Sequence, residues 1–263
     1  MRFTLSQLNK RVAEGDRLVM VSCYDATSGA VCDAAGAELL LVGDSLGMVV
    51  QGHDSTLPVT IDHMVYHTQA VSRGAPRSLV IGDLPFGAYQ RGPEQAFDSA
   101  VKLMAAGAQM VKLEGGAVMA ETVEFLSTRG IPVCGHVGLT PQSVHALGGF
   151  KVQGRDDEAA RRLLDDSKRL EAAGMAMIVL EAIPAPLGKQ ITEALTIPTL
   201  GIGAGPHCDG QILILHDLID MYPGKKAKFV KNFMTGAGSI AGALEAFVRE
   251  VKAGTFPGPE HCY

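Results

Sequence analysis

Short, continuous aliphatic runs recur along the chain, and apolar residues at helical spacing lie between them. Runs of this kind are typical of β-strands buried on both faces, as in a parallel sheet. The amphipathic stretches between them give the alternation expected of parallel β-α units. The expected strands are 18–24, 38–44, 78–84, 108–114, 131–137, 175–181, 196–202 and 210–216, and the expected helices include 25–36, 94–106, 117–129, 156–173 and 186–195.

Eight such units favour a closed (β/α)8 barrel of the TIM type over an open sheet, and 263 residues suit one barrel of about 250 residues. No linker divides the chain, so we expect a single domain over residues 1–263. Capping-box spacing at Thr4 and Gln7 predicts a short N-terminal helix, and 238–253 is expected to be a C-terminal helix.

The stretch 203–209 is too short for a crossover helix. Either it is a tight connection, or 210–217 is itself the helix and the eighth strand lies later.

Four of the aliphatic runs end on an acid, namely Asp44, Asp83, Glu114 and Glu181. In an α/β barrel the C-terminal ends of the strands carry the active site. Asp44 and Asp83 could each instead cap the helix that follows. With Glu114 they would form a cluster of three carboxylates, which repel one another unless a cation or a proton joins them. Oxygen ligands without His or Cys suit magnesium better than zinc.

Three further features concern the chemistry of this rim. Lys112 lies on the same face of its strand as Glu114. Its ammonium could hold a substrate carboxylate, or its amine could form a Schiff base with a carbonyl. The neighbouring acids disfavour the Schiff base, because they keep Lys112 protonated. Glu181 follows the most apolar of the four runs, so we expect it to move protons. His136 also lies near a strand end; it could contact substrate, orient another group or be purely structural.

Composition argues against several partners. The net charge is −5, and the lysines at 225, 226, 228 and 231 are too few for a nucleic-acid surface, so we interpret them as a solvated helix face. No apolar stretch has the length of a signal peptide core or a membrane span. The five cysteines form no C-x-x-C pair, which favours a reducing, cytoplasmic location.

Longer motifs resemble those of the ketopantoate hydroxymethyltransferase family. They are VGDSLGM at 42–48, QGHDSTLPVT at 51–60, GHVGLTPQ at 135–142 and GIGAG at 201–205, and shorter matches continue to 256–261. The resemblance implies a barrel of the phosphoenolpyruvate mutase/isocitrate lyase type. It also implies that 3-methyl-2-oxobutanoate, 5,10-methylenetetrahydrofolate and water give 2-dehydropantoate and tetrahydrofolate, the first committed step of pantothenate synthesis.

The same resemblance assigns roles to individual positions. Asp44, Asp83 and Glu114 match the family's magnesium site, and Glu181 matches its proton acceptor. The keto-acid contacts match Asp44, Ser45, Asp83 and Lys112. The family is commonly homodecameric, so a homo-oligomer is expected.

Two alternatives remain at this stage. A magnesium-dependent lyase of the same superfamily would be expected to carry a reactive cysteine segment similar to Lys-Lys-Cys-Gly-His, which does not occur here. A catalytically silent barrel would be expected to have lost an acid or the lysine, and all of these positions are filled.

Overall fold

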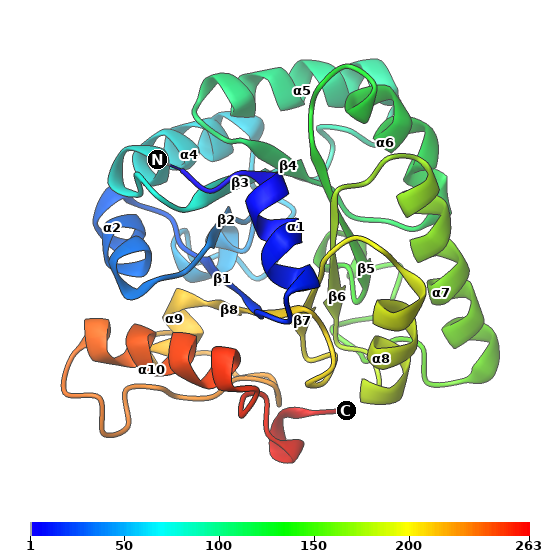
Figure 1. Cartoon of the computed structure of the whole chain (residues 1–263). Helices are drawn as coiled ribbons and strands as arrows, with labels where there is room; N and C mark the ends of the chain where they lie inside the picture. The colour runs from blue at the N-terminus through cyan, green and yellow to red at the C-terminus, as the bar shows by residue number, and fades with distance from the viewer. Residues whose placement is uncertain (1) are drawn as a thin grey trace.

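Eight parallel strands close into a barrel at the centre of the molecule (Figure 1). The computed structural model describes residues 2–263. Each strand pairs with its neighbour in sequence, and β8 pairs with β1 to complete the ring. The strands are β1 (Leu18–Ser22), β2 (Leu39–Val42), β3 (Leu79–Asp83), β4 (Met110–Lys112), β5 (Val133–Gly138), β6 (Met177–Glu181), β7 (Thr199–Ile202) and β8 (Gly210–Ile214).

Every strand overlaps the segment predicted for it, and the predicted (β/α)8 barrel is confirmed. The aliphatic runs are continuous because the strands pack against the barrel interior on one face and against helices on the other. Five strands are buried along their whole length. In β5, β6 and β8 only the last residue is partly exposed, which places an opening at the C-terminal rim.

Helices surround the barrel, as Figure 1 shows. Most predicted helices are present with ends that differ by a few residues; the predicted 117–129 is a 3-10 turn followed by an α-helix. The outer helices are α2 (Ala26–Ala35), α4 (Ile61–Gly74), α5 (Pro93–Ala105), α6 (Ala120–Ser127), α7 (Asp157–Ala172), α8 (Ala185–Ala194) and α10 (Ile240–Ala253). Shorter pieces are α3 (Leu46–Val49), α9 (Leu215–Leu218) and the 3-10 turns η1 (Ala117–Met119), η2 (Pro141–Ser143) and η3 (Pro259–His261).

The predicted N-terminal helix is α1 (Leu5–Ala13), and it begins with the predicted capping box. The Gln7 amide N–H donates to Thr4 Oγ1 at 3.3 Å, and the Thr4 N–H donates to Gln7 Oε1 at 3.0 Å. A cap of this kind contributes about 1 kcal/mol. Leu8 is fully buried, and α1 lies in front of the strands in Figure 1.

A tight connection joins β7 to β8, so the eighth strand is the one predicted at 210–216; the alternative of a helix there is wrong. Gly203 and Gly205 have φ values of 68° and 84°, which let the backbone turn sharply. The Asp209 carboxylate then accepts hydrogen bonds from the Thr199 amide at 2.9 Å and hydroxyl at 3.0 Å. These bonds hold the starts of the two strands together without a crossover helix.

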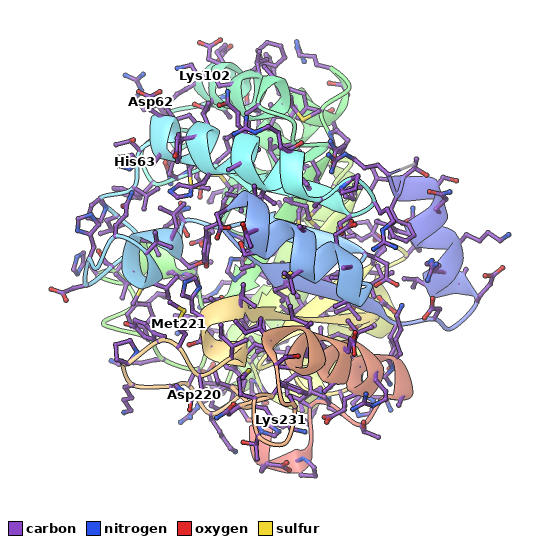
Figure 2. All side chains as sticks on the ribbon, turned by 90° about the vertical axis from the view of Figure 1, so that its left-hand side faces the viewer. Asp62, His63, Lys102, Asp220, Met221 and Lys231 are labelled. Atoms are coloured by element: carbon purple, nitrogen blue, oxygen red, sulfur yellow. The ribbon has the colours of Figure 1, made fainter. Side chains whose placement is uncertain are left out.

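The prediction that the C-terminal lysines lie on a helix face is wrong. Lys225, Lys226 and Lys228 lie in an irregular segment between α9 and α10. Pro223 and Gly224 precede them, and both residues disfavour a helix. Figure 2 shows Asp220 and Met221, from this segment, on the opposite side of the molecule from α1. Across residues 2–263, no helix is both long enough and apolar enough to span a bilayer.

Candidate active site

The charged residues predicted from strand ends lie together at the C-terminal rim. Asp83, Lys112 and Glu181 are the last residues of β3, β4 and β6. Asp44 and Glu114 come two residues after β2 and β4. All five line an inner cavity of about 150 Å³. Barrel closure therefore brings to one place side chains that lie far apart in the sequence.

Lys112 and Asp83 form a buried ion pair. The Lys112 ammonium donates to Asp83 Oδ1 at 2.9 Å and to Oδ2 at 2.8 Å. Burial alone would lower the pKa of Lys112, but Asp83, Glu114 and Asp44 outweigh it and raise that pKa well above its usual value. Lys112 is therefore a fixed cation, which argues against a Schiff base, since that reaction needs the free amine.

Asp44 is buried beside two other acids. Its backbone N–H donates to Asp83 Oδ2 at 3.3 Å, so the two residues are adjacent. Burial, followed by the charges of Asp83 and Glu114, raises the pKa of Asp44 well above its usual range. Its side chain does not cap α3, which has no side-chain cap. The capping role left open for Asp44 therefore has no support here.

One carboxylate oxygen of Glu114 accepts a hydrogen bond, and the other accepts none. Its Oε2 accepts from the Gln142 N–H at 3.0 Å. Oε1 is buried and accepts no hydrogen bond, although it lies 3.5 Å from Lys112 Nζ and 3.4 Å from His136 Nδ1. Burial would raise the pKa of Glu114, but Lys112 and then His136 outweigh it and lower that pKa.

His136 lies between two acids from neighbouring parts of the rim. Its Nε2 is 3.2 Å from Glu181 Oε2, and Nδ1 faces Glu114, although neither contact is aligned as a hydrogen bond. Burial and Lys112 would lower the pKa of His136, but Glu114 and Glu181 outweigh them and raise it to about 9. His136 is thus placed to orient Glu181, one of the roles left open by the sequence.

The backbone turn after Glu181 is strained and tightly held. Ala182 has a φ of 46°, which is unfavourable for a residue with a Cβ. The Ala182 N–H donates to the Ile202 carbonyl at 2.9 Å, and the Gln153 N–H donates to the Ala182 carbonyl at 2.9 Å. Leu139 N–H donates to the Glu181 carbonyl at 2.9 Å. These bonds fix where Glu181 enters the cavity.

Sequence reasoning missed Gln142, Tyr89 and Tyr24. Gln142 donates a side-chain hydrogen bond to Asp44 Oδ2 at 2.9 Å, and Tyr89 donates to Gln142 Oε1 at 2.7 Å. The hydroxyls of Tyr24 and Ser45 lie 2.8 Å apart. Gln142 stands in the GHVGLTPQ motif just after β5, which is a signal for the rim, but no pattern in the sequence shows which acid it reaches.

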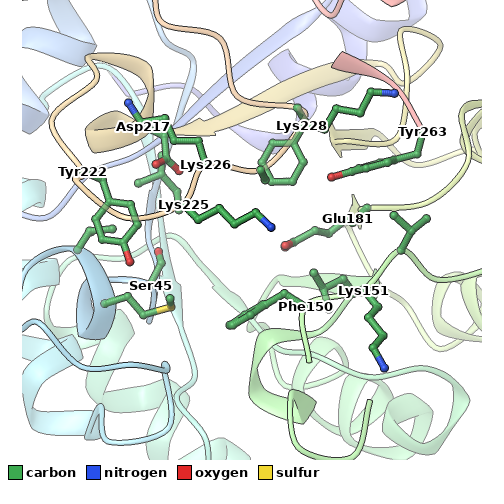
Figure 3. Close-up of a pocket in the computed structure, with 18 residues that line it drawn as sticks. Ser45, Phe150, Lys151, Glu181, Asp217, Tyr222, Lys225, Lys226, Lys228 and Tyr263 are labelled. Atoms are coloured by element: carbon green, nitrogen blue, oxygen red, sulfur yellow. The ribbon is translucent and has the colours of Figure 1, made fainter. Parts of the chain in front are cut away.

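A larger outer cavity of about 640 Å³ opens above the inner one. Ser45, Phe150 and Glu181 line both cavities, so the two are continuous. Figure 3 shows the side chain of Lys225 extending from its loop into the outer cavity in the direction of Glu181. Tyr263, the last residue of the chain, lines the opposite wall.

The lysines of the outer cavity differ in how they are engaged. Lys226 forms an ion pair with Asp220, and Lys228 donates to the Cys262 carbonyl. Among residues 2–263, no ion pair or hydrogen bond occupies Lys225. The outer cavity therefore presents a cation that is available to an anionic ligand.

The inner cavity has the donor set and the charge to accept a divalent cation. Asp44, Asp83 and Glu114 supply buried oxygens, and Glu114 Oε1 has no hydrogen-bond donor. In the described part of the chain, no group of three Asp, Glu, His or Cys side chains is arranged so that it could hold a metal ion. Magnesium keeps several waters and often uses only one or two carboxylates, so an incomplete protein shell suits it.

Comparison with known proteins shows which family the chain belongs to. The model of the ketopantoate hydroxymethyltransferase family matches residues 2–259. The chain belongs to this family. It is 59% identical over 261 residues to the 3-methyl-2-oxobutanoate hydroxymethyltransferase of Azoarcus sp. (strain BH72). The match covers 99% of this chain and 96% of that protein. The enzyme of the same name from Nitrosospira multiformis is 55% identical over 263 residues and covers both chains completely.

Among solved structures, 2,3-dimethylmalate lyase, a PEP mutase/isocitrate lyase superfamily member, matches with a TM-score of 0.58. The match covers 81% of each chain at 18% identity, a level at which only the fold is comparable. The predicted ketopantoate hydroxymethyltransferase resemblance is confirmed by the family model and the relatives, and the predicted barrel fold is shared with this superfamily member. The roles of individual residues stay predictions.

Proposed function

We propose that this chain transfers a one-carbon unit from 5,10-methylenetetrahydrofolate to 3-methyl-2-oxobutanoate, with water as the third reactant, giving 2-dehydropantoate and tetrahydrofolate. Membership of the family supports the reaction. The observation that carries it in this molecule is the single cavity in which Lys112 meets the strand-end acids Asp44, Asp83, Glu114 and Glu181. A keto acid needs a cationic contact for its carboxylate and a base near its C3 carbon, and this cavity offers both.

Asp44, Asp83 and Glu114 would hold magnesium, since they supply the oxygen ligands of the inner cavity. When bound, magnesium supplies Lewis-acid stabilisation for the negative charge that develops on the keto oxygen as the neighbouring C–H loses its proton. Lys112 holds the substrate carboxylate as a point charge. Ser45 assists it, and the Tyr24 hydroxyl at 2.8 Å fixes the direction of the Ser45 hydroxyl.

Glu181 accepts or relays a proton in this scheme. It lies at the junction of the two cavities, so it can reach a keto acid in the inner one and a folate in the outer one. Glu181 therefore either accepts a proton from the C3 carbon of the keto acid or relays a proton to the folate nitrogen as the methylene bridge opens. His136, 3.2 Å away, keeps the Glu181 carboxylate directed into the cavity.

The outer cavity holds the folate in this proposal. Its walls combine Phe150, Tyr222 and Tyr263, which suit a flat aromatic ligand, with lysines that suit the folate's carboxylates. Lys225 and Lys151 both line the cavity without an ion-pair partner among residues 2–263, and Lys225 is the better placed of the two, because Figure 3 shows it directed toward Glu181 and Lys151 directed away.

Assembly and location are part of the same proposal. We expect a homo-oligomer, whose size light scattering would measure. We also expect a cytoplasmic enzyme, since all five cysteines are free thiols and a reducing compartment keeps them so.

The direct test incubates the purified chain with both substrates and magnesium and measures products by mass spectrometry. Equal amounts of 2-dehydropantoate and tetrahydrofolate are expected. If the keto acid is consumed without 2-dehydropantoate, or neither substrate is consumed, the proposed function is wrong.

A further inference from the structure

The side chain of Gln142 crosses the rim of the barrel to an acid that lies 98 residues earlier in the chain. It comes from η2, after β5, and is buried. Its Nε2 donates to Asp44 Oδ2 at 2.9 Å and to the Leu84 carbonyl, beside Asp83, at 2.9 Å. Its backbone N–H donates to Glu114 Oε2 at 3.0 Å. One residue thus contacts two of the three acids and the backbone next to the third.

The side-chain oxygen of Gln142 also has hydrogen-bond partners. Its Oε1 accepts from the Tyr89 hydroxyl at 2.7 Å and from Gln90 Nε2 at 3.1 Å. The Tyr89 hydroxyl in turn accepts from the Glu114 N–H at 3.0 Å. Because the Leu84 carbonyl can only accept, the NH₂ group of Gln142 must face Leu84 and Asp44, which leaves Oε1 facing Tyr89 and Gln90.

We propose that Gln142 is a positioning residue that holds Asp44 and Glu114 in place for a divalent cation. In residues 2–263 it gives the Asp44 carboxylate its one side-chain hydrogen bond. Lys112 pairs with Asp83 and lies 3.5 Å from Glu114 but forms no ion pair with Asp44 among residues 2–263, so the position of Asp44 depends most on this link. A neutral amide provides the link without cancelling the negative charge that attracts the cation. The inference rests on the magnesium site of the proposed function.

Gln142→Met tests this, because methionine keeps most of the shape and removes the side-chain hydrogen bonds. The probe is Mn²⁺ alone, with free Mn²⁺ measured by electron paramagnetic resonance against the metal-free protein. Loss of a residue that orients metal ligands typically weakens affinity about 10- to 100-fold, and we expect the Mn²⁺ dissociation constant to rise by that factor. The Mg²⁺ concentration for half-maximal activity should rise in parallel, and excess Mg²⁺ should restore much of kcat. Gln190→Met, at an exposed position of α8, is the matched control.

The outcomes separate the two proposals. If the unaltered protein binds no Mn²⁺, the metal site fails, and this inference fails with it. If it binds Mn²⁺ and folded Gln142→Met binds it within twofold of the same affinity, only the role of Gln142 is wrong. Should Gln142→Met fail to fold, Tyr89→Phe decides the question, since it removes the hydroxyl that fixes the amide; we expect a severalfold rise in the dissociation constant, and an unchanged constant would overturn the inference.

Discussion

Asp83 and Lys112 are direct neighbours across β3 and β4, and the ammonium donates to both carboxylate oxygens, at 2.9 and 2.8 Å. Both side chains are almost completely buried. Each charge therefore stabilises the other in a place where either alone would be costly. The same pair links the proposed cation site to the proposed carboxylate contact.

Lys112→Met should destabilise the metal-free protein by about 3 to 5 kcal/mol, because it leaves Asp83 buried without its partner. Added Mg²⁺ should recover part of this loss by supplying positive charge. Urea unfolding with and without Mg²⁺ measures both effects. Lys10→Met, which breaks an exposed pair with Glu14, is the control and should cost less than about 1 kcal/mol. A loss for Lys112→Met no larger than the control's would contradict the account.

Glu181→Gln should fold and bind the keto acid but lose turnover by about 10²- to 10⁴-fold, because the amide cannot accept the proton. Steady-state kinetics and calorimetric binding of the keto acid give the two readouts. Glu193→Gln, at a solvent-exposed ion pair of α8, should behave as the unaltered protein does. Near-normal turnover in Glu181→Gln would remove Glu181 from the mechanism.

Lys225→Ala should raise KM for 5,10-methylenetetrahydrofolate by about three- to tenfold and leave KM for the keto acid unchanged. The reason is that Lys225 reaches only the outer cavity, whereas the keto acid is expected in the inner one. Lys102→Ala, on the outside of α5, is the matched control (Figure 2). Equal changes in both KM values would argue against separate subsites.

Asp217 gives the stability a pH dependence that can be measured. Burial raises its pKa to about 6, against a smaller opposite effect of Lys226. The folded state therefore holds this proton more tightly than the unfolded state, and stability falls as pH rises from about 4 through about 6. Asp217→Asn should remove that loss, so its gain in unfolding free energy should be about 1 kcal/mol larger at pH 8 than at pH 5. Urea unfolding at both pH values, with Asp98→Asn as an exposed control, tests this; a gain that does not change with pH would contradict it.

The sequence was sufficient for the barrel and for the rim of acids, since both follow from local patterns. Continuous aliphatic runs predict strands that are buried on both faces, and closure places Asp44, Asp83 and Glu114 together once the strands are counted. The tight β7–β8 connection stayed ambiguous, because Asp209 replaces the missing crossover through contacts with Thr199 that no periodicity reveals.

The residues that the sequence did not predict act through long-range contacts. Gln142 reaches Asp44 across the barrel, and nothing in a Thr-Pro-Gln turn specifies that partner. The run of lysines by itself predicts a helix face for Lys225, whereas the preceding Pro223 and Gly224 disfavour a helix there. Such side chains depend on where loops return over the barrel, which composition and spacing do not determine.

The central claim is that this cavity removes the C3 proton of 3-methyl-2-oxobutanoate with the help of a divalent cation. Proton nuclear magnetic resonance of the keto acid in heavy water, with enzyme and Mg²⁺ but no folate, tests it most directly. We expect the C3 proton signal to disappear in the presence of Mg²⁺ and to persist when a chelator is added. Loss of this exchange in Glu181→Gln would assign that residue to the carbon, and its retention would assign it to the folate. A C3 signal that persists with the active enzyme and saturating Mg²⁺ would contradict the account.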